Sequence, residues 1–286
     1  MCILKKGDHI GIVACSNGQP LTNKNKIESL LLQLKNLNLN PICSEYIYEV
    51  NSPFNGSAKD KGKAFMNLYK NHEVKAIFDI SGGDLANEVL DYLDYNYIAQ
   101  NPKPVFGYSD LTTVLNAIYA KTNNSVYLYQ VRNLIYSDSE NQKANFINSL
   151  FNSTDDLFNF SYKFIQGKSI EGIVIGGNIR CLLKLAGTKY MPDFTDKVLF
   201  LESMGGEAGL MSAFLNQLKQ MGAFDKIRGL LLGTFSKMQE NNISPTIEEL
   251  IIKTIDNPNL PVAKTEEIGH GATSKCIIIG KSINLK

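Results

Sequence analysis

The chain has 286 residues, of which 44% are hydrophobic, and its formal net charge at pH 7 is +1. A chain of this length can form one large domain or two ordinary ones. Because lysines are scattered among acids and the charges nearly cancel, we expect no nucleic-acid partner and no binding to an anionic membrane. No stretch approaches the roughly 18 apolar residues of a membrane span, and the N-terminus has no apolar run typical of a signal peptide.

Cysteine usage indicates the redox environment. The five cysteines are odd in number, widely spread and contain no Cys-x-x-Cys pair. This pattern argues against a disulfide framework and against a zinc site, so we expect a reducing, cytoplasmic location. The sequence also lacks a His-x-x-x-His pair and acids at metal-ligand spacing, and we therefore expect no metal and no cofactor.

In the first half of the chain, short apolar runs alternate with amphipathic helical patterns. Strands are predicted over residues 9–15, 41–44, 75–80, 104–107 and 126–130, and helices over 22–39, 58–71, 85–93 and 110–119. This alternation predicts an α/β fold, with a parallel sheet and helices on both faces. Ligand sites of such sheets lie beyond the carboxyl ends of the strands, where the loops with Ser16, Gly82-Gly83 and Ser109 should gather.

The alternation stops after residue 130, and a polar, asparagine-rich region with one helical stretch at 144–151 follows. Residues 152–156 resemble a linker. A second unit then begins, with strands predicted over 170–175, 197–202, 227–235, 261–263 and 276–279, helices over 179–186, 210–221 and 247–255, and a turn at 176–178. We therefore divide the chain into a first domain, residues 1–155, and a second domain, residues 165–286.

Ser109 lies in a sharp turn between a short strand and an amphipathic helix. In this position its hydroxyl would point away from both elements, and the amide of Asp110 would be free to donate to a developing oxyanion. A serine before a helix is more commonly a simple cap, so the turn by itself favours that interpretation. Ser109 becomes a nucleophile only if a base lies within reach.

Two further residues stand out as candidates. His270 lies between two glycines in a predicted loop, whereas His9 begins a strand and His72 follows a solvated helix end. A lone histidine is more often structural than catalytic, so chemistry alone leaves His270 open. Glu202 directly follows the apolar run 198–201. It is either an exposed acid at a strand end or the hydrogen-bond acceptor that a histidine base needs for its other ring nitrogen.

Several segments occur together in a distinctive order and separation. They are Ser81-Gly-Gly-Asp84, Asn101 to Thr112, Gly176-Gly-Asn178, Gly187 to Pro192, Val198 to Glu202 and Gly269-His270. In combination they resemble the LD-carboxypeptidase family of serine peptidases, including its microcin C self-immunity branch. The resemblance runs over nearly the whole chain, and its most specific parts are the Gly-Tyr-Ser-Asp turn and the downstream Leu-Glu and Gly-His pairs.

The resemblance implies a fold and a set of roles. Family members have an N-terminal flavodoxin-like domain, similar to glutamine-amidotransferase folds, and a smaller, β-rich C-terminal domain, and a homodimer is expected. Ser109 falls on the nucleophile, His270 on the general base and Glu202 on the carboxylate that orients it. The amide of Asp110, with one from the Gly82-Gly83 loop, would form the oxyanion hole.

Two departures from the family concern the pocket. Many members carry a Gly-Pro pair after the strand that begins at Val126, where this chain has Gln130-Val131. Members often have an arginine on the helix after the glutamate, where this chain has the glycine-rich stretch 205–211. Both departures leave the choice of substrate open.

Three interpretations of function follow. The first is a cytoplasmic LD-carboxypeptidase of peptidoglycan recycling, which hydrolyses the amide before the terminal D-amino acid of a muropeptide. The second applies the same chemistry to a peptidyl-nucleotide antibiotic. Residues 90–103 resemble the immunity branch, whereas the lack of room for a long pocket insertion after Tyr136 favours the carboxypeptidase. The third is a binding protein without catalysis, and the retention of Ser109, Glu202 and His270 argues against it.

An α/β-hydrolase is disfavoured because the turn lacks the second elbow glycine.

Overall fold

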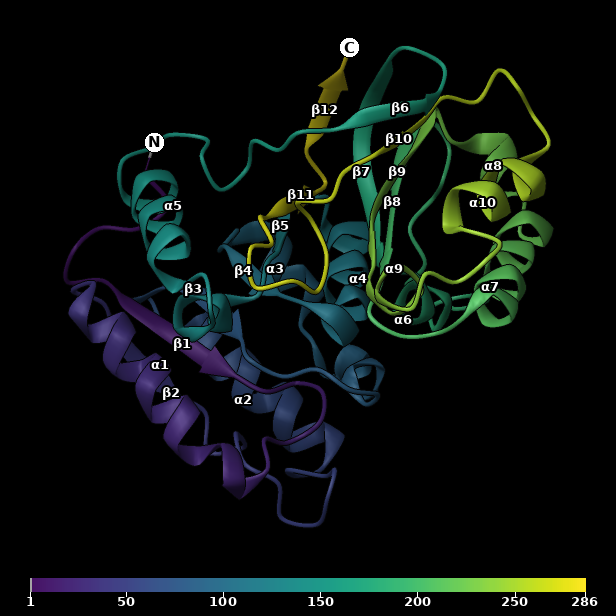
Figure 1. Ribbon diagram of the computed structural model, residues 1–286. Coiled ribbons are helices and arrows are strands. Elements are labelled where there is room, and N and C mark those ends of the chain that lie inside the picture. The colour runs from purple at the N-terminus through teal and green to yellow at the C-terminus, as the bar shows by residue number, and fades with distance from the viewer. Residues whose placement is uncertain (1) are drawn as a thin grey trace.

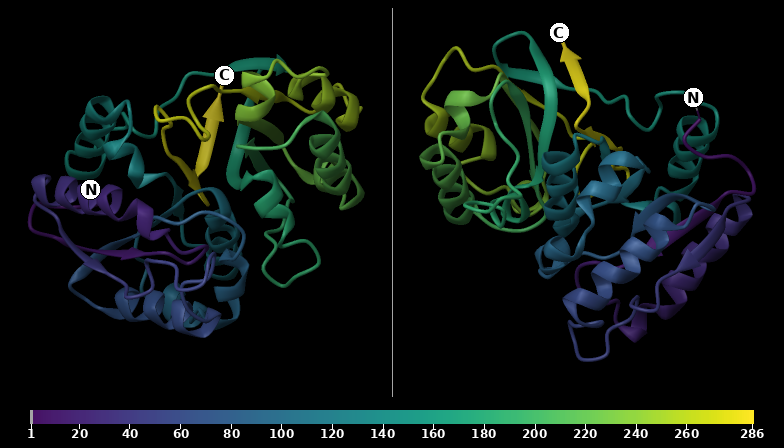
Figure 2. Two further views of the ribbon diagram at one scale, coloured as in Figure 1. Left: turned by 60° about the horizontal axis from the view of Figure 1, so that its bottom comes forward. Right: turned by 180° about the vertical axis from the view of Figure 1, so that it is seen from behind.

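Two six-stranded β-sheets organise the computed structural model, which describes residues 2–286 (Figure 1). The first sheet comes from the N-terminal half of the chain with one strand from near the C-terminus, and the second sheet comes from the C-terminal half. Figure 2 shows the purple and blue elements of the first part beside the green to yellow helices of the second part.

The first sheet has the parallel architecture that the sequence predicts. Its strands, in spatial order, are β2 (Asn40–Cys43), β1 (His9–Val13), β3 (Val74–Asp79), β4 (Val105–Gly107), β5 (Val126–Leu128) and β11 (Ile277–Ile279). All neighbours are parallel except β11, which runs antiparallel to β5. The order 2-1-3-4-5 is that of flavodoxin-like sheets, so the predicted fold class of this part is confirmed.

Helices cover both faces of this sheet. On one face, α1 (Lys24–Asn36) and α5 (Ser139–Phe151) share a core with Ile10 and Phe78. On the other face, α2 (Ala58–Lys70) and α4 (Thr112–Thr122) share a core with Val13 and Ile77. Successive residues of a strand point to opposite faces, which is why a strand buried on both sides is apolar throughout. The remaining helical segments of this part are η1 (Leu21–Asn23), η2 (Ala86–Tyr92), α3 (Tyr95–Gln100), η3 (Ser109–Leu111) and η4 (Val131–Ile135).

The second sheet is also mainly parallel, with antiparallel edge strands. Its order is β12 (Ser282–Leu285), β7 (Ile170–Asn178), β8 (Lys197–Ser203), β9 (Gly229–Phe235), β10 (Val262–Lys264) and β6 (Lys163–Gln166). The edge strands β12 and β6 run antiparallel to their neighbours. Its helices are α6 (Ile179–Leu183), α7 (Ala208–Gln220), α8 (Ala223–Lys226), α9 (Ser236–Glu240) and α10 (Ile247–Ile255). This part matches the predicted β-rich α/β domain.

Two predicted elements differ in the structure. Residues 86–92 form a 3-10 helix, and the buried Ala86 and Val89 are three residues apart, which is the repeat of that helix. Gly176-Gly177-Asn178 is the end of β7 rather than a turn. At Gly177 a Cβ atom would lie 2.6 Å from Oγ1 of Thr112, so the missing side chain allows this strand end to contact α4 directly.

Polar contacts join α4 to the end of β7. The side-chain amide of Asn116 donates to the carbonyl of Gly176 (2.8 Å), and its oxygen accepts from the amide of Gly176 (2.9 Å). The amide of Asn178 donates to Thr112 Oγ1 at 3.0 Å. One continuous apolar core includes residues of both sheets around these contacts. The helix that follows Ser109 is therefore fixed against the second part of the molecule.

The two C-terminal strands belong to different sheets. β11 completes the first sheet, and β12, which begins three residues later, completes the second. We keep the division at residues 1–155 and 165–286 as a proposal for the two domains, with the difference that β11 is a strand of the first sheet. Within residues 2–286, no helix has both the length and the apolar character needed to cross a membrane.

Candidate active site

Ser109 occupies a strained turn between β4 and α4. It begins the 3-10 turn η3, and its φ angle is +55°, in the left-handed region. A non-glycine residue in this region costs about 1–3 kcal/mol and persists where the surrounding structure over-determines it, as at many active sites. The strand–turn–helix arrangement matches the sequence prediction, and it presents the serine hydroxyl at the carboxyl end of the first sheet.

His270 and Glu202 lie next to Ser109, although they are far from it in the sequence. His270 Nε2 lies 3.1 Å from Ser109 Oγ, and His270 Nδ1 lies 2.5 Å from Glu202 Oε2. Glu202 is fully buried in β8, so the alternative of an exposed acid at a strand end is wrong. A carboxylate only accepts hydrogen bonds, so Nδ1–H donates to Glu202 and Nε2 is left to accept from the Ser109 hydroxyl. The three side chains form one hydrogen-bonded series.

The ring of Tyr108 supports the histidine. Its centroid lies 4.5 Å from that of the His270 ring, with the planes tilted by 55°. Burial, together with the negative charge of Glu202, raises the pKa of the Tyr108 hydroxyl well above its usual value, so this group stays neutral. The glycines on either side of His270 leave its backbone free, whereas Tyr108 and Glu202 restrict the ring.

Two loop amides next to Ser109 are available as donors. Within the described chain, the amides of Asp110 and Gly83 donate to no protein acceptor. Gly83 has a φ of +122°, and a Cβ atom there would lie 2.2 Å from Cγ of Asn17. A Cβ built on Gly82 would lie 3.8 Å from that of Ser109, so this loop runs beside the serine. The structure thus brings together the residues that the sequence suggested for an oxyanion hole.

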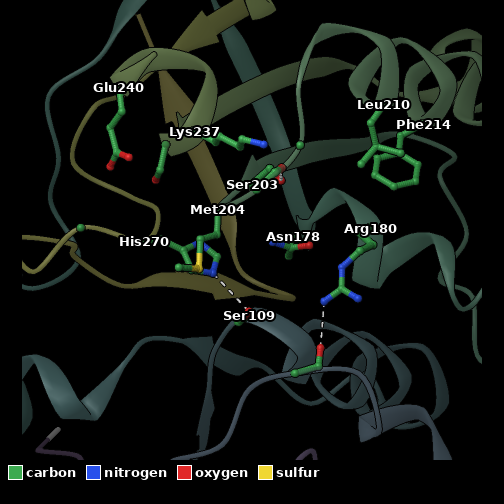
Figure 3. Close-up of a pocket in the computed structure, with 15 residues that line it drawn as sticks. Ser109, Asn178, Arg180, Ser203, Met204, Leu210, Phe214, Lys237, Glu240 and His270 are labelled. Carbon is green, nitrogen blue, oxygen red and sulfur yellow. Dashed lines mark hydrogen bonds between the residues drawn. The ribbon is translucent and has the colours of Figure 1, made fainter.

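The serine lies at the floor of a cleft between the two parts of the molecule (Figure 3). The cleft has a volume of about 660 Å³, within the range of small-molecule sites. In Figure 3, Ser109 lies on the first part, whereas His270, Asn178 and Met204 approach from the second part. The further lining residues include two apolar side chains and two charged ones, Leu210, Phe214, Lys237 and Glu240.

The two loops that depart from the family pattern have different surroundings. Gly205 and Gly206 line the cleft directly. At Gln130-Val131, where many family members carry a Gly-Pro pair, Gln130 precedes the 3-10 helix η4, which Val131 begins. Asn133 of this helix donates to the carbonyl of Ser274 at 3.3 Å, and Arg132 donates to the side chain of Gln19. Among residues 2–286, no three histidine, cysteine or acidic side chains form a cluster that could hold a metal.

Sequence reasoning missed two cations beside the cleft. Arg180 and Lys184 come from α6 and the residue after it, and both contact loops of the first part. The hydrogen bond from Arg180 lowers the pKa of Asp84, which is thus fully ionised at neutral pH. The available signal was the i, i+4 spacing of Arg180 and Lys184 in an otherwise apolar segment. The other residues of this segment are buried, Ile179, Cys181, Leu182 and Leu183.

A two-part α/β fold, with a strained serine hydrogen-bonded to a histidine where the parts meet, defines a serine-type hydrolase. The family model for the LD-carboxypeptidase N-terminal domain matches residues 10–130, and the family model for the LD-carboxypeptidase C-terminal domain matches residues 171–285. The chain therefore belongs to the LD-carboxypeptidase family and is a serine-type carboxypeptidase. These matches confirm the resemblance that the sequence motifs indicated.

Relatives and solved structures cover nearly the whole chain. The microcin C7 self-immunity protein MccF of Escherichia coli is 24% identical over 93% of this chain and 87% of its own length. The murein tetrapeptide carboxypeptidase of Pseudomonas aeruginosa is 21% identical over 81% of this chain and 78% of its own length. The structure of muramoyltetrapeptide carboxypeptidase from Oxalobacter formigenes is similar with a TM-score of 0.79 and 20% identity, covering 96% of this chain and 94% of that one.

We expect hydrolysis to be insensitive to iodoacetamide. Cys15 is adjacent to the site loops, and burial, with the charge of Asp79, raises the pKa of its thiol well above the usual value. Burial raises the pKa of Cys181 and Cys276 as well, so none of the three forms the reactive thiolate near pH 7. Intact-mass analysis should find labelling of the half-buried Cys2 and of the exposed Cys43 alone, more slowly at Cys43 because burial also raises the pKa of its thiol, with activity retained. Inhibition that follows the labelling of Cys15 would contradict this expectation.

Proposed function

We propose that Ser109, His270 and Glu202 are the nucleophile, general base and orienting carboxylate of an LD-carboxypeptidase that removes the terminal D-amino acid from a murein peptide. The observation that carries this proposal is the hydrogen-bonded series from Ser109 Oγ through the imidazole to the buried carboxylate. The series lies at the floor of a cleft large enough for a peptide end.

The reaction follows from this arrangement. His270 Nε2 takes the hydroxyl proton as Ser109 Oγ attacks the carbonyl carbon of the last peptide bond, and the carbonyl oxygen becomes an oxyanion. Glu202 stabilises the imidazolium that forms. The imidazolium then gives its proton to the leaving amine, the C–N bond breaks, and the D-amino acid departs. Water, deprotonated by His270, hydrolyses the acyl-enzyme and regenerates the serine.

We also propose that the amides of Asp110 and Gly83, with Gly82 as the neighbouring candidate, bind the oxyanion. Two observations support this assignment: the loops lie beside Ser109, and the amides of Asp110 and Gly83 donate to no protein acceptor in the described chain. Removing one such donor typically lowers kcat by about 10²–10³-fold. A change in the backbone position of either loop should therefore lower kcat.

A carboxypeptidase must also bind the carboxylate at the end of its substrate. Lys237 lines the cleft and forms a 2.9 Å ion pair with Glu207, with both side chains about half exposed. Such an exposed ion pair contributes little to stability, so a substrate carboxylate can replace Glu207 as the partner of Lys237 with little loss of free energy. The names of two relatives, murein tetrapeptide carboxypeptidase and muramoyltetrapeptide carboxypeptidase, support a murein peptide as this substrate.

A second candidate substrate is a peptidyl nucleotide, as in microcin C self-immunity. Met204 and Leu210 are 63% and 46% exposed on the cleft wall, and Phe214 lies beside Leu210 (Figure 3). An exposed apolar wall of this kind suits a planar base. The structures of MccF in complex with aspartyl sulfamoyl adenosine and with glutamyl sulfamoyl guanosine resemble this fold, each with a TM-score of 0.86.

One experiment separates the candidates. Purified protein is incubated with a murein tetrapeptide that ends in D-alanine and, separately, with an aspartyl sulfamoyl adenosine. Release of D-alanine supports the carboxypeptidase, whereas release of the sulfamoyl nucleoside supports the immunity hydrolase. Hydrolysis of neither compound contradicts both proposed substrates. It favours a binding protein on the same fold if Ser109-dependent ester hydrolysis is absent as well.

We further propose that the protein acts in the cytoplasm as a homodimer, as the family resemblance implies. Sedimentation velocity at micromolar concentration tests the second part of this proposal. A species of 31.8 kDa, the mass of one chain, would contradict the homodimer.

A further inference from the structure

Two cations of the second domain reach across the cleft to the loops beside Ser109. Arg180 Nη2 donates to the carbonyl of Gly83 at 2.8 Å, and Nη1 pairs with the carboxylate of Asp84. Lys184 Nζ donates to the carbonyl of Asp84 at 2.8 Å and pairs with the carboxylate of Asp110. We call Arg180 and Lys184 the α6 clamp. Its contacts include both loops that carry the proposed oxyanion donors.

The Asp110 side chain is the centre of these contacts. It is fully buried, and Oδ2 accepts from the Ser16 hydroxyl at 2.6 Å and from the amide of Ala86 at 2.8 Å. Oδ1 faces Lys184, whose side chain is 19% exposed. A buried carboxylate is tolerated only when it is paired and hydrogen-bonded, and here the cation comes from the other domain. Both carboxylate oxygens of Asp110 therefore have partners, and these contacts restrict Asp110, the residue that follows the nucleophile.

We propose that the α6 clamp positions the two halves of the oxyanion hole, so that the second domain aligns the amide of Asp110 with the amide of Gly83. This inference depends on the proposed function of Ser109. Neither cation touches the reacting atoms in the structure; both are positioning residues that act through the loop carbonyls and the Asp110 carboxylate.

The clamp should act on the transition state more than on substrate binding. Oxyanion donors must lie about 2.7–3.1 Å from the oxygen that develops charge, and that charge exists fully only in the tetrahedral state. A displacement of about 1 Å can cost 10²-fold in rate. Loosening either loop should therefore lower kcat and leave KM nearly unchanged.

The test measures kcat, KM and Tm for the Lys184→Met variant, with p-nitrophenyl acetate as the substrate. This small ester needs the serine and the oxyanion hole but not the peptide-binding surface. We expect kcat to fall about 10²-fold, as for the loss of one oxyanion donor, with KM nearly unchanged. Lys184→Arg, which keeps the charge, should recover most of the rate.

Lys189→Met is the matched control. Lys189 pairs with Asp91 across the same two domains at 3.2 Å, but both side chains are largely exposed. This variant should keep the wild-type kcat. Equal kcat values for Lys184→Met and Lys189→Met would overturn the inference, as would a loss in Lys184→Met that only follows the unfolded fraction measured by circular dichroism.

A second variant covers the case in which Lys184→Met does not fold. Arg180 is 42% exposed, so Arg180→Met should fold, and we expect its kcat to fall with KM unchanged. A wild-type kcat in Arg180→Met would then overturn the clamp. Ester hydrolysis that persists in Ser109→Ala would instead contradict the catalytic serine. Ser109-dependent ester hydrolysis without cleavage of the tetrapeptide or of the aspartyl sulfamoyl adenosine would contradict only the proposed substrates.

Discussion

Replacing Ser109 with alanine is expected to lower the kcat of D-amino-acid release by about 10⁶-fold, the loss measured when a triad serine is removed elsewhere. No other hydroxyl is hydrogen-bonded to His270 in the described chain, so the reaction would lose its nucleophile. The remaining rate would come from the oxyanion donors and from substrate binding. Single-turnover measurement of D-alanine from a murein tetrapeptide gives the readout.

The fold should be unaffected by this change, because alanine removes one oxygen and keeps the Cβ atom. Tm and the far-ultraviolet circular dichroism spectrum should match those of the wild type. Ser29→Ala, on the outer face of α1, is a suitable control, since its hydroxyl donates only to the carbonyl of Asn25. A folded Ser109→Ala protein with substantial activity would refute the assignment of the nucleophile.

Changing Glu202 to glutamine is expected to lower kcat by about 10⁴-fold, as for the comparable change in a Ser-His-Asp triad. Glutamine has nearly the same shape, but it cannot stabilise the imidazolium. Its amide NH₂ can also donate to Nδ1, which places the imidazole proton on Nε2, where it blocks acceptance from Ser109. Steady-state kinetics on the same tetrapeptide gives the readout.

Stability separates this effect from a structural one. Glu202 is buried, so replacing its charge with a neutral amide should leave Tm unchanged or slightly raise it. Glu171→Gln, in the neighbouring strand β7 with an exposed side chain, is the matched control and should retain wild-type kinetics. If Glu202→Gln retained the kcat of this control, Glu202 would have no role in the reaction.

The sequence was sufficient for most of the fold because its hydrophobic periodicity is strong. The apolar runs within β1, β3 and β8 indicated buried strands, and the alternation with helices in the first half of the chain predicted its parallel sheet. It was insufficient at Gly176 to Asn178, where two glycines resemble a turn but extend a strand. Only the contact with Thr112 and Asn116 explains that conformation, and it comes from a distant part of the chain.

For the site, local patterns identified candidates but could not bring them together. The sharp turn at Ser109 was predicted, whereas the left-handed φ angle of the serine was found only in the structure. Ser109 and His270 are 161 positions apart in the sequence, and local patterns do not show that the fold brings them together. The family resemblance supplied that link. Arg180 and Lys184 were missed because solvated cations on a helix are common, and only burial of Asp110 distinguishes this pair.

The division of β11 and β12 between the two sheets also has a consequence for folding cooperativity. The chain passes from the edge of one sheet to the edge of the other within a few residues, through Gly280 and Lys281. Because only two residues separate β11 from β12, pairing of each strand with its own sheet keeps the two sheets close together. The apolar core is also continuous between the sheets. The two domains should therefore melt in one calorimetric transition, and the cleft should keep a fixed width instead of opening and closing as a hinge.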